Sequence, residues 1–177
     1  MRVEVVEIAP EEGLSELAAH GCELVVAEQY PGHSRAHHQG LERSVLGRDA
    51  IRLAVASEDP ATSLKDLRDR AWVMEPVGTA ARTWATQQCR AAGFEPDVRF
   101  EFADLTAHVR LVTSGHAVGM IPDLVMEGVA FRGQLIALPG APEREILAAT
   151  RRSSSSRPGV AAVHAALQRA FVTYAQP

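Results

Sequence analysis

Hydrophobic and polar residues follow each other in two rhythms along the chain, one typical of strands and one of helices. Alternation with period two, or a short apolar run, predicts a strand, whereas apolar residues three and four positions apart predict a helix. Strands are expected over residues 3–8, 24–27, 41–46, 51–55, 72–74, 98–102, 118–122, 135–138 and 145–150. Helices are expected over residues 11–20, 64–67, 80–92, 105–115 and from 160 onward. This alternation predicts an α/β fold with a parallel or mixed sheet flanked by helices.

Several helix ends carry sequence signals of their own. Ser63 is expected to cap the short helix that follows, with Asp66 completing the capping pattern. Asp104 has the right side chain for the cap of the next long helix, and Gly93 suits the end of the helix before it. The polar stretch 30–40 is expected to be a loop, because proline and glycine residues bound it.

Composition and charge narrow the classes of protein that fit. The chain has 177 residues, 46% hydrophobic and 23% charged, which is typical of a globular domain. Its net charge of −4 does not favour direct binding to nucleic acid. The chain contains no apolar run of about 18–20 residues and no signal peptide at its start, so we expect a cytoplasmic protein without membrane contact. Cys22 and Cys89 are expected to be buried free thiols.

The sequence lacks the usual catalytic and cofactor motifs. It contains no G-x-S-x-G, no H-E-x-x-H, no phosphate loop and no G-x-G-x-x-G after a strand. His33, His37 and His38 gather in the loop, but no cysteine or carboxylate cluster completes a set of metal ligands. We therefore expect no catalytic residue, no metal and no cofactor.

The best candidate site is the turn from Glu75 through Val77, Gly78 and Thr79, which joins a strand to a helix. Ligands of open α/β sheets bind beyond the carboxyl ends of the strands, where free backbone N–H groups attract an anion or a polar group. A simple helix cap would give the same pattern, so both interpretations stay open. Two further strand ends could border the same cleft; they comprise Ala103, Asp104 and Leu105 in one case and Gln29 in the other.

The order of these motifs resembles the effector-binding domain of LysR-type transcription regulators. Residues 20–26, His-Gly-Cys-Glu-Leu-Val-Val, are similar to the family's G-E-L-D-L-A-I strand. Residues 90–96 end in Gly-Phe-Glu-Pro, which matches the family's G-F-x-P. Residues 109–122 are similar to V-x-x-G-x-G-I-x-x-L-P, and the ordered matches extend over nearly the whole chain.

The resemblance implies a fold like the type 2 periplasmic binding proteins, with two interleaved α/β lobes and mixed sheets. Lobe I would comprise residues 1–54 and 126–177 and lobe II residues 55–125, with the family's first strand–helix unit missing before Arg2. The chain would cross between lobes near residues 51–56 and 122–126. Effector contacts would fall at Gly78, Thr79, Ala103 and Asp104 and, near the hinge, at Pro122.

The function implied by the resemblance is that of a sensor. A small organic effector, anionic or polar, would bind in the cleft and shift the population of lobe arrangements. The partners implied are this effector, further copies of the chain in a dimer or tetramer, and DNA through a helix-turn-helix domain absent from this chain. A stand-alone solute-binding protein or, less well supported, an enzyme could share the fold, because a fold does not fix a function.

Overall fold

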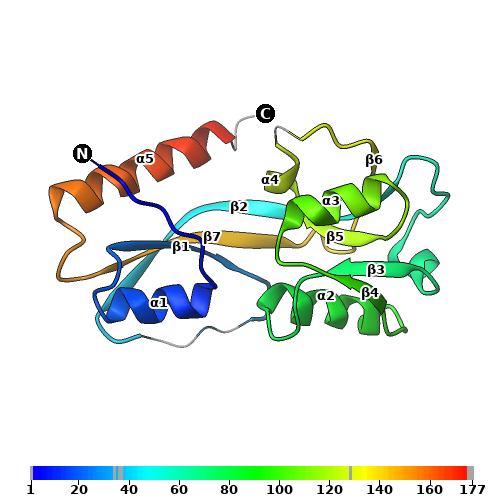
Figure 1. Ribbon diagram of the computed structural model, residues 1–177, viewed down its shortest axis with the longest axis horizontal. Helices are drawn as coiled ribbons and strands as arrows, with labels where there is room; N and C mark the ends of the chain where they lie inside the picture. Colours follow the sequence, from blue (N-terminus) through cyan, green and yellow to red (C-terminus); the bar gives the residue numbers. More distant parts are fainter. Residues whose placement is uncertain (1, 34, 36–37, 128, 175–177) are drawn as a thin grey trace. The chain divides into compact units, whose positions relative to one another are not determined.

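The structure is a computed structural model that describes residues 2–33, 35, 38–127 and 129–174. Contacts divide the described chain into two compact units, each formed by segments that are distant in the sequence. Unit 1 draws on residues 1–29, 34–48 and 145–177, and unit 2 on residues 30–33 and 49–144. Two long strands, β2 (Leu41–Ala56) and β7 (Glu143–Arg151), each contribute to both units (Figure 1).

The boundaries of these units differ from the lobe boundaries expected at 54/55 and 125/126. Residues 126–144 belong to unit 2 because β6 (Gly133–Ala137) pairs with β2 in antiparallel register, Arg52 opposite Ala137 and Ala56 opposite Gly133. Phe131 packs against the apolar cluster around Ile121, next to the short helix α4 (Asp123–Met126). No local sequence pattern identifies β2 as the partner of β6. The order of the motifs alone therefore could not assign residues 126–144 to a unit.

Unit 1 is built from helix α1 (Pro10–Ala18), strand β1 (Leu24–Gln29) and helix α5 (Pro158–Tyr174), with β7 and the first part of β2. β1 pairs with β7 in antiparallel register, Leu24 opposite Thr150. Its core comprises Leu14, Leu17, Leu41 and Ala149, and Leu46, Ile146 and Ala148 with Leu167 and Phe171 against them. β1 is not covered on both faces, because Val26 is 47% exposed on a strand that ends the described order of the sheet.

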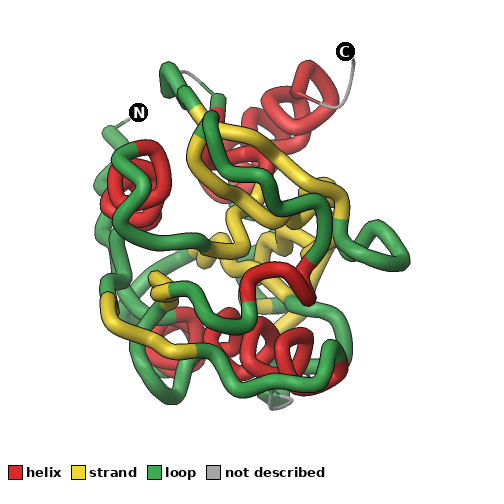
Figure 2. The backbone as a smooth tube through the Cα atoms, turned by 90° about the vertical axis from the view of Figure 1, so that its right-hand side faces the viewer, coloured by secondary structure: helices red, strands yellow, loops and turns green. Residues whose placement is uncertain are grey.

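The strand expected over residues 3–8 is not formed. The tube in Figure 2 is a loop from the N-terminal end to the first helix. Val5 and Val6 are among the most exposed apolar residues described. Alternating valines favour an extended chain, but a strand also needs a neighbour for its backbone hydrogen bonds, and no described strand pairs with this segment.

Unit 2 contains two layers of helices around short strands. β3 (Ala71–Met74) and β4 (Asp97–Glu101) are parallel, and β5 (Gly119–Pro122) pairs antiparallel with β2. Helices α2 (Ala80–Ala91) and α3 (Leu105–Thr113) follow β3 and β4, and the 3-10 helix η1 (Leu64–Leu67) precedes them. The sheet pairings are therefore mixed, as the sequence predicts.

Alternate side chains of β3 pack into the apolar clusters on its two opposite faces. Trp72 and Met74 belong to the cluster that includes Trp84 of α2, whereas Val73 belongs to the cluster that includes Val109 and Val112 of α3. Successive side chains of a strand point to opposite faces. The two helices consequently cover opposite sides of β3 (Figure 1), and the ends of both strands are held between their first turns.

The two extended stretches expected around Gly47 form a single strand, β2, of 16 residues. The expected gap between the strands, at residues 47–50, is therefore part of β2. A larger residue at position 47 would be too close to α5, because its Cβ atom would lie 2.9 Å from the ring of Phe171. The glycine thus marks a close contact with α5 and not a turn.

Candidate functional site

The first strand-to-helix turn starts helix α2 as the sequence predicts. Thr79 is the cap, and its hydroxyl oxygen accepts a hydrogen bond from the backbone N–H of Arg82 at 3.1 Å. The same hydroxyl donates to the carbonyl oxygen of Pro76 at 3.0 Å. Gly78 adopts φ 97°, a left-handed conformation that favours glycine, and Val77 is 77% exposed. The turn is therefore shaped first of all by its own hydrogen bonds.

We predict that Thr79→Val lowers the free energy of unfolding by about 1 kcal/mol, because it removes the helix cap. For a chain of this size the melting temperature should fall by roughly 2–4 °C. Thr79→Ser retains the hydroxyl and serves as the matched control in thermal unfolding followed by circular dichroism. A melting temperature of Thr79→Val equal to that of the serine variant would contradict the capping role.

The second turn ends strand β4 and starts helix α3. Asp104 is the cap predicted from the sequence, and its carboxylate accepts a hydrogen bond from the backbone N–H of Thr106 at 2.8 Å. The hydrogen bonds from Thr106 hold the pKa of Asp104 below its ordinary value. Since β3 and β4 are parallel, the first turns of α2 and α3 begin at the same edge of the strands.

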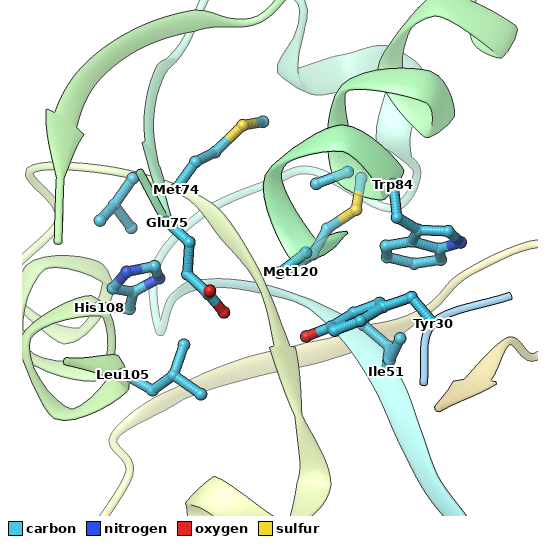
Figure 3. Close-up of a pocket in the computed structure, with 11 residues that line it drawn as sticks. Tyr30, Ile51, Met74, Glu75, Trp84, Leu105, His108 and Met120 are labelled. Atoms are coloured by element: carbon cyan, nitrogen blue, oxygen red, sulfur yellow. The ribbon is translucent and has the colours of Figure 1, made fainter. Parts of the chain in front are cut away.

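A pocket lies at this edge, wholly within unit 2 (Figure 3). Its walls come from the ends of β3 and β5, the first turns of α2 and α3, and the start of unit 2 at Tyr30. The lining residues are Tyr30, Ile51, Val73, Met74, Glu75, Ala81, Trp84, Ala85, Leu105, His108 and Met120. About 20 Å³ is open to the centre of a water molecule, which is room for a water-sized guest.

Two polar groups face each other among these apolar walls. Figure 3 shows the carboxylate of Glu75 pointing between the ring of His108 and the hydroxyl of Tyr30. His108 Nε2 lies 2.7 Å from the carbonyl oxygen of Phe102, and because a carbonyl only accepts, we assign the hydrogen to Nε2. Burial lowers the pKa of His108, outweighing the hydrogen bond to Phe102 and the charge of Asp104. His108 is thus neutral at neutral pH, with Nδ1 as an acceptor.

Behind the pocket, a buried ion pair joins Asp49 and Arg144. Arg144 Nε donates to the carboxylate of Asp49 at 2.9 Å, and the backbone N–H of Leu124 donates to the same carboxylate at 2.8 Å. Burial alone would lower the pKa of Arg144, but the charges and hydrogen bonds of Tyr30 and Asp49 raise it. Tyr30 therefore belongs both to the pocket wall and to this network.

The residues predicted from the sequence fall into two groups. Glu75 and Leu105 line the pocket. The other predicted residues lie outside its lining: Val77, Gly78, Thr79, Ala103 and Asp104 in the two turns, Gln29 at the end of β1 in unit 1, and Pro122 buried opposite Ile51. The role of each in binding an effector stays a prediction.

Sequence reasoning missed most of the wall. His108 follows Leu105 at a spacing of three on α3, and Trp84 is the aromatic residue of α2. Helical spacing from Leu105 could have found His108, whereas no helical repeat links Thr79 to Trp84, five positions later. Tyr30, Ile51 and Met120 meet the pocket through long-range folding, so no local pattern marks them.

Other chemically active groups lie away from the pocket. Ser44 Oγ is 2.6 Å from His164 Nε2 in unit 1, and among the described residues no carboxylate is hydrogen-bonded to that histidine. The described residues contain no group of three metal-ligating side chains, and His37 lies outside them. Burial raises the pKa of the Cys89 thiol to about 12, as fits an unreactive core cysteine.

The fold and the pocket define an α/β ligand-binding domain, and comparison with known proteins identifies its family. The sequence profile of the LysR substrate binding domain matches residues 1–172. The chain therefore belongs to the LysR substrate binding domain family, the effector-binding part of LysR-type regulators, with the type 2 periplasmic-binding-protein-like fold. The family is one of regulatory domains and not of enzymes.

Two solved structures similar to this chain are an effector-binding domain and a regulatory domain. The BenM effector binding domain with its effector benzoate has TM-score 0.73 at 18% identity, over 98% of this chain and 79% of that chain. The Synechocystis PCC6803 CcmR regulatory domain in complex with 2-PG has TM-score 0.71 at 15% identity, over 91% and 79%.

Comparison with a longer relative shows what share of a full-length regulator this chain covers. CbnR, a LysR family transcriptional regulator, has TM-score 0.68 at 20% identity, and the match covers 95% of this chain but 58% of CbnR. No curated protein sequence matches the chain. In the part of the chain that the structure describes, no helix has the length and apolar character needed to cross a membrane.

Proposed function

We propose that this chain senses a small organic effector by binding it in the pocket at the carboxyl ends of β3 and β4. The observation that carries the proposal is the position of this pocket, between the first turns of α2 and α3, in a domain of this family. In open α/β sheets ligands bind at such strand ends. The BenM domain has been solved with benzoate as its effector, so a guest of similar size is reasonable.

Binding requires the pocket to widen. The space open to the centre of a water molecule, about 20 Å³, admits water, and an organic guest needs more room. Met74 and Met120 form part of the wall, and their unbranched thioether side chains repack at low cost. A guest would therefore select conformations in which these side chains have moved, and its differential affinity would shift the population of states.

Membership of the family supports a proposal for the rest of the regulator. We propose that the domain works in the cytoplasm as part of a dimer or tetramer. Effector binding to it would control a regulator that binds DNA through a separate helix-turn-helix domain. Full-length CbnR, a longer relative, has been solved in complex with its target DNA. Ligand sensing, and not catalysis, is the activity proposed for this chain itself.

Blocking the pocket tests the proposal. Ala81→Phe places a ring at the start of α2, where Ala81 lines the pocket, and should abolish stabilisation by ligands. A compound that binds the folded protein at 100 times its dissociation constant stabilises it by about 2.7 kcal/mol. We expect a library of small metabolites, screened by thermal unfolding, to contain compounds that raise the melting temperature of wild type but not that of Ala81→Phe.

The matched control is Ala91→Phe, the same change at an exposed position on the same helix. It should keep the response of wild type. Compounds that stabilise both phenylalanine variants equally would place the binding site elsewhere. A library that stabilises none of the three proteins would contradict the proposed function.

A further inference from the structure

We infer that His108 selects the ligand of the pocket in unit 2, by accepting a hydrogen bond from a guest that carries a hydroxyl or N–H group on a small apolar body. The inference rests on the proposed function and names the chemical class of its ligand. It narrows the expected anionic or polar effector to a polar one that donates a hydrogen bond. Three features of the site support it: the fixed position of His108, its remaining acceptor atom and the apolar wall around it.

The first feature is the fixed position of His108. This residue lies one helical turn after the cap of α3 and is 2% exposed. Its Nε2 donates to the carbonyl oxygen of Phe102 at 2.7 Å, and the backbone N–H of Phe102 donates to the carbonyl oxygen of Met74 at 3.1 Å. The imidazole is thereby tied through Phe102 to the end of β3. A guest meets a ring whose orientation is set before binding, which lowers the entropy cost of the contact.

The second feature is the ring nitrogen that remains. Because the hydrogen of the neutral ring is on Nε2, Nδ1 carries a lone pair and can accept a hydrogen bond. Burial lowers the pKa of His108, which favours this neutral form at neutral pH. Among the hydrogen bonds of the described residues, none is donated to Nδ1. A guest that fills the pocket shields this acceptor from water, so the acceptor lacks a partner unless the guest donates to it.

The other donors of the pocket wall lie away from His108. Figure 3 shows the hydroxyl of Tyr30 and the indole of Trp84 across the pocket from this histidine. The carboxylate of Glu75 lies between Tyr30 and His108. Glu75 and Tyr30 have contacts of their own within the protein, and the hydroxyl of Tyr30 is hydrogen-bonded to Arg144. The hydrogen for Nδ1 is therefore expected from the guest.

The third feature is the apolar character of most of the wall. Its aliphatic and thioether side chains come from four elements and give a polar guest no strong hydrogen bond; they are Ile51, Val73, Met74, Leu105 and Met120. In pockets of this kind the apolar wall packs against the body of the ligand, and a few placed polar groups give the specificity. His108 is such a polar group here.

Two probes with one ring each test the inference: phenol, which donates a hydrogen bond, and anisole, which does not. Isothermal titration calorimetry on the whole chain should give wild type an affinity for phenol about tenfold higher than for anisole. His108→Phe removes the acceptor and retains an aromatic ring, so it should lower the affinity for phenol about tenfold and abolish the preference. The matched control is His116→Phe, the same change at an exposed histidine after α3, which should keep the preference of wild type.

Nuclear magnetic resonance of the protein with isotope-labelled histidine nitrogens gives a second readout that needs no variant. In a neutral imidazole the nitrogen without a hydrogen has a chemical shift far from that of the protonated one. Nδ1 of His108 should have the shift of the unprotonated nitrogen, and phenol, but not anisole, should change it. A hydrogen on Nδ1 in the free protein would overturn the inference.

The binding data can overturn it in three further ways: equal affinities of phenol and anisole in wild type, a preference for phenol that persists in His108→Phe, or no binding of either probe. The proposed function has a separate test. Library compounds that stabilise wild type but not Ala81→Phe, without any advantage of phenol over anisole, would leave that function intact and reject the role of His108 alone. Failure of the whole metabolite library would instead reject the proposed function.

Discussion

Replacing Arg144 with methionine is expected to lower the free energy of unfolding by about 3–5 kcal/mol, because it leaves the carboxylate of Asp49 buried without its ion partner. Both side chains are almost fully buried, at 9% and 0% exposure. Methionine has nearly the volume of the aliphatic part of arginine. The lower free energy of unfolding therefore comes mainly from the buried carboxylate of Asp49, which has lost its ion partner. Urea unfolding followed by circular dichroism measures it.

The pH dependence gives this prediction a second readout. Burial raises the pKa of Asp49 above its ordinary value of 3.8, while Arg144 and the N–H of Leu124 act to lower it. In Arg144→Met the largest lowering influence is gone, so the pKa in the folded state rises further. A carboxyl group with a raised folded-state pKa favours folding when protonated, below its unfolded pKa, and this advantage is lost as pH rises through the folded pKa. The deficit of the variant relative to wild type should therefore be smaller near pH ~4 than at neutral pH.

An exposed ion pair supplies the control. Arg48 faces Glu145 at 3.3 Å and is 65% exposed, so Arg48→Met should cost at most about 1 kcal/mol. Replacing both members of the buried pair, in Asp49→Leu with Arg144→Met, should recover much of the loss. A deficit of Arg144→Met that is small and independent of pH would show that Asp49 is not a stranded charge.

The second large effect is expected at Trp84. Trp84→Ala removes a buried indole that packs on Tyr30, and large-to-small changes of this kind cost about 3–5 kcal/mol. The change also joins the new cavity to the existing pocket. An apolar cavity as large as an indole ring binds small aromatic molecules. Free indole should therefore raise the melting temperature of Trp84→Ala and leave that of wild type unchanged.

Thermal unfolding with and without indole measures both effects. Trp84→Leu, which keeps part of the apolar volume, should lose less stability and respond less to indole. A Trp84→Ala protein as stable as wild type would mean that the indole contributes little to the core. Stabilisation of all proteins by indole would show that the compound binds at another site.

Local patterns predicted local structure well. The caps at Ser63, Thr79 and Asp104 are formed at the expected residues, because a capping hydrogen bond joins atoms only two or three residues apart. The alternation in residues 3–8 failed as a strand signal, since pairing depends on a distant neighbour. The strand was expected to stop before Gly47, but β2 runs through this residue, whose close contact is with Phe171, more than a hundred residues further on.

The same distinction governs the candidate site. The sequence predicted the strand end with Glu75 and the helix start with Leu105, both of which line the pocket. Tyr30, Ile51 and Met120 come from three separate segments that meet only after folding. Glu75 and His108 face each other in the pocket although they lie 33 positions apart in the sequence, so no local pattern pairs them.

The network of Tyr30, Asp49 and Arg144 has an evolutionary consequence. Each of the three residues stands where the chain passes between the units, at 29/30, 48/49 and 144/145. Tyr30 also lines the pocket. A lineage that adapts to a new effector by changing Tyr30 therefore alters the surroundings of a buried ion pair in the same step, and compensating substitutions should accumulate at Asp49 and Arg144.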